Sequence, residues 1–200
     1  MTAIELSFGM TCSATIPADH GYALLGAVSR LIPDAHSGVG FAIAPIRGCE
    51  VGGRQISIDA RSPFVIRTSP DRICEFLPLA GKSLDLLGRK IVLGVPSIHQ
   101  LTACATVRAR MVTIKGFFER ILFRDAVRRQ LDLISVGDCM IDIRKKRTLR
   151  IKQQEIVGYE TVLDGLSEHE SLIVGTNGVG GRRHMGCGFF VPFEQKENHG

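Results

Sequence analysis

Six histidines are the side chains in this sequence best suited to proton transfer, and three of them lie in informative settings. His36 lies in a polar segment, residues 34–38, that follows an amphipathic run, and His20 lies just before that run. His184 lies in a segment rich in glycine and arginine. Because histidine gains and loses a proton near neutral pH, such residues can act as general acid and general base. The remaining histidines have no neighbours that suggest a role: His99, His169 and His199.

RNA is a substrate that this chemistry is sufficient to cut. A base removes the proton of the 2'-hydroxyl, which attacks the adjacent phosphate, while an acid protonates the leaving 5'-oxygen. A nearby cation stabilises the charge on the phosphate. The six cysteines lie far apart and form no closely spaced Cys/His cluster of the kind that zinc needs. We therefore expect no metal and no other cofactor.

A glycine-rich segment, residues 178–192, places glycines and positive charges directly before an apolar strand. Glycine lets backbone amides approach a phosphate closely, and arginine adds charge-assisted contacts. The segment lacks the Gly-Lys-Ser/Thr of a nucleotide-binding loop and leads into a strand instead of a helix, which excludes that class of site. The predicted phosphate contacts are Gly180, Gly181, Arg182, Arg183 and His184.

The net charge of +5 favours an anionic partner, and most of the excess lies late in the chain. Cations that alternate along a predicted hairpin could grip the A-form stem of a folded RNA through its backbone, although such a run is also typical of a solvated surface. These residues are Arg144, Lys145, Lys146, Arg147, Arg150 and Lys152. Arg128 and Arg129, on a predicted helix, are further candidates for contact with the stem or with a partner protein.

The hydrophobic pattern predicts an α+β fold with two halves that repeat one order of elements. In the first half, Asp19 is the expected N-cap of the first helix. The predicted strands are residues 4–11, 40–46, 54–60 (with 62–67 as an extension), 84–87 and 90–95, and the predicted helices are 21–31 and 70–79. Strand, helix, strand, strand, helix, strand is the split-βαβ order of a ferredoxin-like, or RRM-like, domain.

The second half shows the same order of elements without an obvious repeat in sequence. Its predicted strands are residues 106–114, 148–152, 155–163 and 185–191, and its predicted helices are 119–134 and one that begins at Ser167. Glu170 closes a capping box at the start of that last helix. We place the boundary between residues 96 and 103, which gives domains at residues 1–98 and 104–193.

The glycine-rich ending carries a family resemblance. Residues 180–192 resemble the ending of the repeat-processing endoribonucleases of CRISPR systems, the Cas six family, in its Myxan subtype. Residues 17–31, and residues 147–152 leading to Val157 and Gly158, fit the same family. A glycine-rich loop after the last helix of a second ferredoxin-like half also resembles the hallmark of the wider superfamily of repeat-associated RNA-binding proteins.

This resemblance implies tandem ferredoxin-like halves with a C-terminal glycine-rich loop, and cleavage within the repeat of a CRISPR precursor transcript. His36 is the first choice for the catalytic histidine because the family commonly carries one in this loop, and His20 is the second. Tyr22 and Ser29 are weaker catalytic candidates, and Arg30 is a candidate for phosphate contact. Which histidine is the acid and which the base stays open.

The implied partners are the repeat stem-loop, the mature guide RNA and the subunits of a class 1 effector complex, with this chain as monomer or homodimer. The main rival is a non-catalytic subunit that binds guide RNA without cutting it. A small-molecule enzyme of the same fold would carry an acidic or metal-binding cluster, and none is visible. No apolar run is long enough for a transmembrane helix, and the start lacks a signal peptide pattern, so we expect a cytoplasmic protein.

Overall fold

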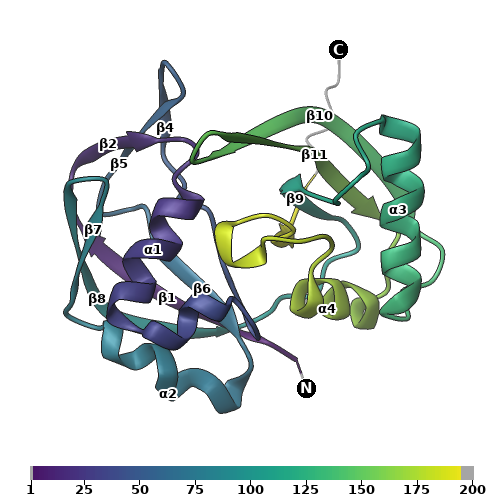
Figure 1. Cartoon of the computed structure of the whole chain (residues 1–200). Coiled ribbons are helices and arrows are strands. Elements are labelled where there is room, and N and C mark those ends of the chain that lie inside the picture. Colours follow the sequence, from purple (N-terminus) through teal and green to yellow (C-terminus); the bar gives the residue numbers. More distant parts are fainter. Residues whose placement is uncertain (1, 195–200) are drawn as a thin grey trace. The chain divides into compact units, whose positions relative to one another are not determined.

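The computed structural model describes residues 2–194, except for the side chain of His36. Contacts divide the chain into two compact units. Unit 1 runs up to Gln100 and takes in two later segments, Arg150–Gln154 and Arg182–Gly186. Unit 2 is the rest of the described chain. Figure 1 labels the elements of both units.

Unit 1 is built on a five-stranded antiparallel sheet with the order β3-β6-β1-β8-β7. Its elements are β1 (Ile4–Thr11), α1 (Gly21–Leu31), the 3-10 turn η1 (Pro33–Ser37), β3 (Phe41–Ile43), β6 (Phe64–Thr68), a helical stretch of η2 (Pro70–Arg72), α2 (Ile73–Phe76) and η3 (Leu77–Leu79), then β7 (Ser83–Leu86) and β8 (Arg89–Gln100). Without the edge strand β7, this is the split-βαβ arrangement. The prediction of a ferredoxin-like half is confirmed.

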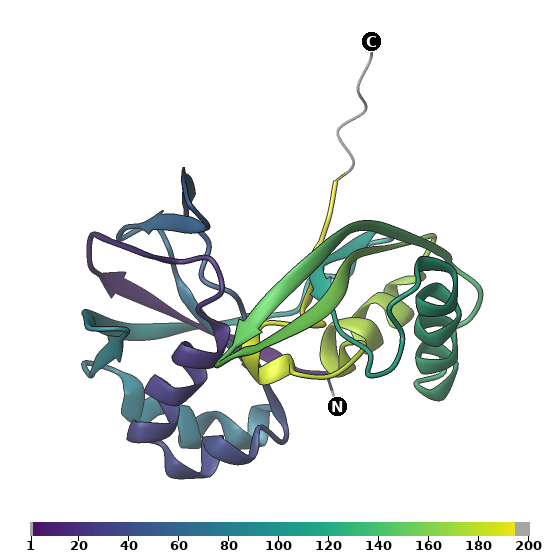
Figure 2. The same cartoon turned by 45° about the horizontal axis from the view of Figure 1, so that its top comes forward.

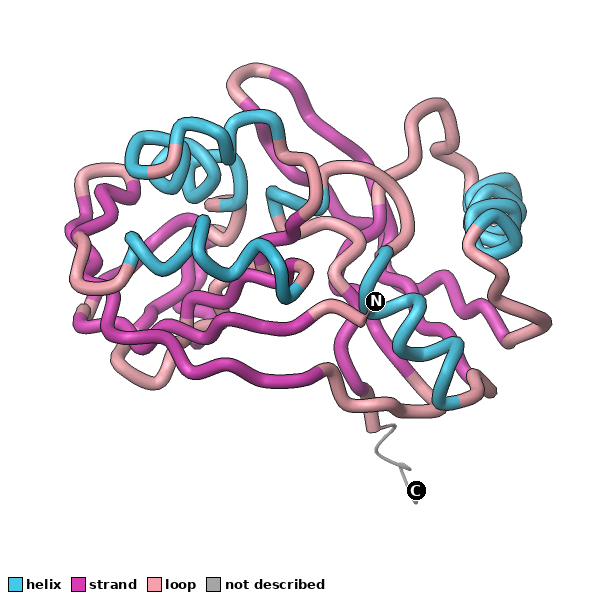
Figure 3. The backbone as a smooth tube through the Cα atoms, turned by 90° about the horizontal axis from the view of Figure 1, so that it is seen from below, coloured by secondary structure: helices cyan, strands magenta, loops and turns pink. Residues whose placement is uncertain are grey.

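Alternation along the central strands produces the core of unit 1. Leu6 and Phe8 of β1 pair with Ile66 and Phe64 of β6, and all four side chains are fully buried. Leu24, Leu25 and Val28 of α1 and Phe76 and Leu79 of the second helical stretch join the same cluster. Both helices therefore cover one face of the sheet, as the chain trace in Figure 3 also shows.

A second, three-stranded sheet in unit 1 changes the predicted pairing of the strands. Its order is β2-β5-β4, from β2 (Ala14–Pro17), β4 (Cys49–Gly52) and β5 (Gln55–Ile58). The predicted strand at residues 54–60 therefore lies outside the main sheet, and its expected extension, β6, is the true third ferredoxin strand.

The predicted N-cap of helix α1, Asp19, was wrong. The N-cap residue is His20, and the Asp19 carboxylate pairs with Arg54 at 2.5 Å.

Unit 2 repeats the arrangement with a four-stranded sheet, order β10-β11-β9-β12. Its elements are β9 (Val107–Val112), α3 (Arg120–Leu133), β10 (Met140–Ile151), β11 (Gln154–Asp164), α4 (Glu168–Asn177) and β12 (Phe190–Pro192). Phe123 and Val127 of α3 and Val174 of α4 pack with Ala109 and Phe190 in one core. The predicted capping box is confirmed, with Ser167 and Glu170 bonding each other's backbone N–H groups.

Two boundaries in unit 2 differ from the prediction. Strand β10 begins at Met140, eight residues before the predicted start, because its early part alternates between apolar and charged residues. The last strand is confined to residues 190–192. Gly186 and Gly188, with φ of 85° and 61°, lie in the left-handed region and break the extended run expected there. In the described part of the chain, no helix is both long and apolar enough to cross a membrane.

Candidate RNA-processing site

The start of helix α1 is fixed by His20. The Ile46 N–H donates to His20 Nε2 at 3.0 Å, so Nε2 is unprotonated and Nδ1 carries the ring proton, which it donates to the Pro17 carbonyl at 2.9 Å. The side chain is only 1% exposed. His20 therefore joins the end of β2, the first turn of α1 and the segment after β3, and it has no ring nitrogen directed at solvent. This geometry is that of a positioning residue.

Five residues of the glycine-rich segment, Arg182–Gly186, belong to unit 1, and we call them the docked turn. Their middle part is the 3-10 turn η4 (Arg183–Met185), closed by bonds from the Met185 and Gly186 N–H groups to the carbonyls of Arg182 and Arg183 at 2.9 and 3.1 Å. The turn packs against α1 and β3, and Met185 contacts the core of unit 1. Burial lowers the pKa of the Arg183 guanidinium.

Two glycines make room for the docked turn. A Cβ on Gly21, the first residue of α1, would overlap the backbone of Met185. A Cβ on Gly38 would overlap the imidazole of His184. Residues at both positions must therefore lack a side chain for the turn to lie where it does, and His184 lies in van der Waals contact with the segment that follows η1.

His36 lies in that same segment, near the end of η1. Its side chain is outside the described part of the structure. Its backbone is two residues before Gly38, and consecutive Cα atoms lie about 3.8 Å apart. The loop of the first-choice histidine and the ring of His184 are therefore neighbours in unit 1.

The other candidates on α1 divide between its two ends. Tyr22 is exposed at the N-terminal end, beside Gly21 and the docked turn. Ser29 and Arg30 lie about 10–12 Å further along the helix axis, at 1.5 Å per residue. The Ser29 hydroxyl is buried, and Arg30 donates to the Asp85 carbonyl of β7 at 2.7 Å. Tyr22 is thus brought to the docked turn, and Ser29 and Arg30 are not.

The glycines that precede the docked turn have a different role from the one predicted. In unit 2, the Gly180 N–H donates to Gln130 Oε1 at 2.6 Å, and the Gly181 N–H donates to the Thr113 carbonyl at 2.9 Å. The Thr113 hydroxyl in turn donates to the Gly181 carbonyl at 3.1 Å. Because these amides are already bonded to protein acceptors, they anchor the segment instead of forming a phosphate cradle.

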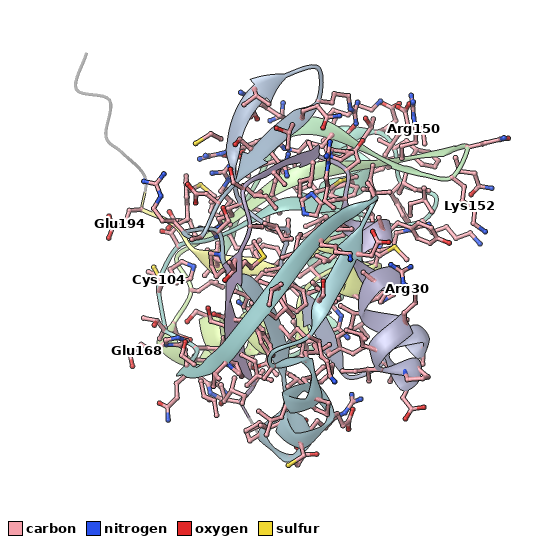
Figure 4. All side chains as sticks on the ribbon, turned by 90° about the vertical axis from the view of Figure 1, so that its left-hand side faces the viewer. Arg30, Cys104, Arg150, Lys152, Glu168 and Glu194 are labelled. Atoms are coloured by element: carbon pink, nitrogen blue, oxygen red, sulfur yellow. The ribbon has the colours of Figure 1, made fainter. Side chains whose placement is uncertain are left out.

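The tip of the β10–β11 hairpin, Arg150–Gln154, also belongs to unit 1. Figures 1 and 2 both show the tip and the docked turn beside the N-terminal end of α1. Arg150 and Lys152, labelled in Figure 4, are exposed. Their side chains have no hydrogen-bond or ion-pair partner among residues 2–194. The tip therefore brings two available cations to the same end of α1.

Further back on β10 the cations are held by unit 2. Glu160 of β11 is 5% exposed and binds Arg108 and Arg147 at 2.7 and 2.8 Å, one arginine on each oxygen. Arg144 pairs with Asp142 at 2.7 Å and lies over the ring of Phe193 at 5.3 Å. Arg144 and Arg147 were predicted to contact RNA. The structure instead shows both of them in ion pairs within unit 2. Lys145 and Lys146 between them are exposed.

The two arginines predicted on α3 also contact their own unit. Arg128 donates to Asp132 at 2.9 Å and to the carbonyls of Val136 and Gly137 at 2.5 and 2.8 Å. These bonds attach the loop after α3 to the helix. Arg129 is exposed but lies over the Phe117 ring at 5.2 Å. Arg128 is therefore a helix-end residue, whereas Arg129 keeps a solvent-facing guanidinium.

The docking positions are the residues that sequence reasoning missed. Glycine at the first position of a helix was a usable signal for Gly21, because alanine is more favourable in helices. Gly38 and Pro45 gave no such signal. Pro45 packs against Gly186 of the docked turn, and a Cβ added to Gly186 would lie 2.9 Å from the Pro45 ring. Among the described residues, no group of three or more His, Cys, Asp or Glu side chains could hold a metal ion.

Comparisons with known proteins agree with this fold. The family model described as Cas6 Crispr matches residues 4–195. A curated protein of Myxococcus xanthus (strain DK1622), "CRISPR-associated endonuclease Cas6", is 33% identical over 192 residues, which cover 96% of this chain and 82% of that protein.

Two solved structures share the fold at low identity. One, "CRISPR associated protein Cas6", has a TM-score of 0.66 at 13% identity and covers 96% of this chain and 99% of the other. A second, "An RAMP protein binding different RNA substrates", has a TM-score of 0.64 at 15% identity, with 97% and 100% covered. The extent of the family match and the identity to the Myxococcus protein decide the assignment: this chain belongs to the Cas6 family.

Proposed function

We propose that this protein is an endoribonuclease that cuts the repeat of a CRISPR precursor transcript through attack of the RNA's own 2'-hydroxyl. The observation that carries the proposal is the contact between Gly38, two residues after His36, and the imidazole of His184 in the docked turn. The curated relative is named as a CRISPR-associated endonuclease, which supports the proposal of a nuclease.

In this proposal His36 removes the 2'-hydroxyl proton, and the attack gives a 2',3'-cyclic phosphate and a 5'-hydroxyl. Arg182 and Arg183 belong to the docked turn, which contacts α1 at Gly21 beside Tyr22, and all three would contact or orient the phosphate. Arg150 and Lys152 of the hairpin tip, with Lys145, Lys146 and Arg129, would bind the backbone of the repeat stem. His20 would position the helix start, while Ser29, Arg30, Arg128, Arg144 and Arg147 have internal roles.

After cleavage the protein would retain the mature guide RNA as part of a class 1 effector complex. Cations that contact a phosphate backbone before the cut contact the same phosphates of the stem afterwards, which supports slow release of the product. A lasting complex would appear as a burst of one product per protein in a cleavage time course. A linear time course without a burst would contradict retention.

The proposed reaction is tested with repeat RNA in excess EDTA, beside the same RNA with one 2'-deoxy nucleotide before the cut. We expect cleavage of the all-ribose RNA alone. Equal cleavage of both RNAs would contradict attack by the 2'-hydroxyl. Tight binding without cleavage of either, with or without added Mg²⁺, would instead identify a non-catalytic guide-RNA-binding subunit.

Replacing the proposed base provides the residue-level test. His36→Ala should slow single-turnover cleavage by about 10²- to 10⁴-fold, because a general base supplies about that factor, and should leave the Kd for repeat RNA within a few-fold. His99→Ala is a matched control, since His99 is exposed on β8 and among residues 2–194 its side chain bonds only Ser97, at 2.8 Å. Normal cleavage by His36→Ala would remove His36 from the reaction.

A further inference from the structure

His184 is the described imidazole that the structure brings to the His36 loop. Unit 1 contains three described histidine side chains, at positions 20, 99 and 184. Both ring nitrogens of His20 bond the backbone. His99 pairs across the sheet with Glu5, whose neighbours Ile4 and Leu6 face the core under α1, so His99 lies on the opposite face.

The contacts of His184 restrict its position, and the residue is not fully buried. The ring lies against Gly38 on one side, and the side chain is half-buried. The flanking residue Met185 packs into the core and against Gly21. A histidine whose turn is held on both sides has a restricted position, which is what proton transfer in a defined geometry requires.

We propose that His184 is the general acid of the cleavage reaction, a proposal that rests on the function proposed above. His36 takes the 2'-hydroxyl proton as the 2'-oxygen forms its bond to phosphorus. As the bond from phosphorus to the 5'-oxygen breaks, His184 gives its proton to that oxygen, which leaves as a hydroxyl. Proton exchange with water then restores both imidazoles.

A bound phosphate beside His184 would favour the acid role over the base role, against the positive charges of Arg182 and Arg183, which oppose protonation of the imidazole. Arg182 and Arg183 precede it in the docked turn and would draw a phosphate to the turn. A phosphate next to an imidazole favours the protonated form, because the opposite charge stabilises the imidazolium. Bound RNA would therefore supply the charge that keeps His184 ready to donate.

The test compares two leaving groups at the cut site. One repeat RNA carries the natural 5'-oxygen, and the other carries a bridging 5'-sulfur, which leaves as a thiolate without needing an acid because thiols ionise near pH 8–9. Under single-turnover conditions with saturating protein, His184→Ala should cut the oxygen substrate about 10²- to 10⁴-fold more slowly than the unchanged protein. It should cut the sulfur substrate at nearly the unchanged rate.

The pattern across variants separates this proposal from the others. His36→Ala should be slow on both substrates, because the sulfur does not replace the base. Equal slowing of His184→Ala on both substrates would overturn the acid role and leave a phosphate contact, and normal cleavage of the oxygen substrate would overturn any role in the chemistry. Failure of the unchanged protein to cut either RNA would instead contradict the proposed function.

A second variant tests the position of the docked turn without touching His184. Gly21→Ala would push against the Met185 backbone and displace the turn, so it should slow the oxygen substrate more than the sulfur substrate. Gly26→Ala is the matched control, because nothing lies within 4 Å of a Cβ at this position of the same helix. Equal rates for the two glycine variants on the oxygen substrate would show that the docked turn does not position the acid.

Discussion

The cations of strand β10 and of the turn that follows it lie in two regions with different surroundings. At the base of the hairpin, Arg144 and Arg147 bind carboxylates of unit 2. At the tip, Arg150 and Lys152 have exposed side chains and no bonded partner in the described chain. All four residues belong to one run of positive charge in the sequence. Only the first pair faces a carboxylate within the sheet, and this difference determines which arginines stabilise the fold and which remain available for phosphate.

The comparison shows that a basic run identifies an RNA surface only after internal partners are known. Glu160 lies 13 residues after Arg147 and reaches it across the hairpin. An arginine held in this way has lost side-chain freedom in the fold and has fewer donors left for a ligand. The proposed RNA surface therefore includes the tip and the docked turn, but it excludes Arg144 and Arg147 on the hairpin.

The largest effect is expected from removing the charge of Glu160, at the base of the β10–β11 hairpin. Glu160→Gln should lower the free energy of unfolding by about 3 kcal/mol, because it leaves two arginines without the charge that compensates their burial. Urea unfolding of the full chain measures this change. Glu155→Gln on the same strand is the matched control, since Glu155 is exposed and should change stability little. If the two variants were equally stable, the ion pairs of Glu160 with Arg108 and Arg147 would not stabilise the fold.

A smaller effect should distinguish tip from base in RNA binding. Replacing Arg150 and Lys152 together by Gln should lower the slope of log K against log salt by about 1.8, at about 0.9 for each lost contact with duplex phosphate. Arg144→Gln should leave the slope unchanged, because Arg144 already binds Asp142. Filter binding at several salt concentrations gives both slopes. A larger change from Arg144→Gln than from the tip variant would reverse the assignment.

Much of the fold was predictable because its signals are local. Helix α1 has the predicted bounds, Gly21–Leu31, because its apolar residues recur at helical spacing. The capping box of Ser167 and Glu170 was predictable from residues three apart. The third ferredoxin strand was not, because four short strands, β3 to β6, lie between α1 and α2 and their pairing depends on contacts distant in sequence.

The candidate site was less predictable for the same reason. The loop of His36 was identified from its polar residues, but the contact that brings His184 to it joins Gly38 to a residue far along the chain. The two bonds of His20 depend on where Ile46 lies after folding. Nothing in the sequence near His20 distinguishes a histidine buried against backbone from one open to substrate.

The smallest effect concerns a carboxylate of unit 2, Glu170, that is less buried than Glu160. Glu170 accepts bonds from the Ser167 side chain and backbone and from the Gly137 N–H at 2.7 Å, which lower its pKa from 4.5 to about 2. Since the unfolded carboxyl binds a proton at higher pH than the folded one, this contribution to stability is present above pH 4.5 and is lost as the pH falls toward 2. The Tm of the unchanged protein should therefore fall across this window more than that of Glu170→Gln, measured by circular dichroism. Parallel curves for the two proteins would mean that the bonds to Glu170 do not favour its charged form.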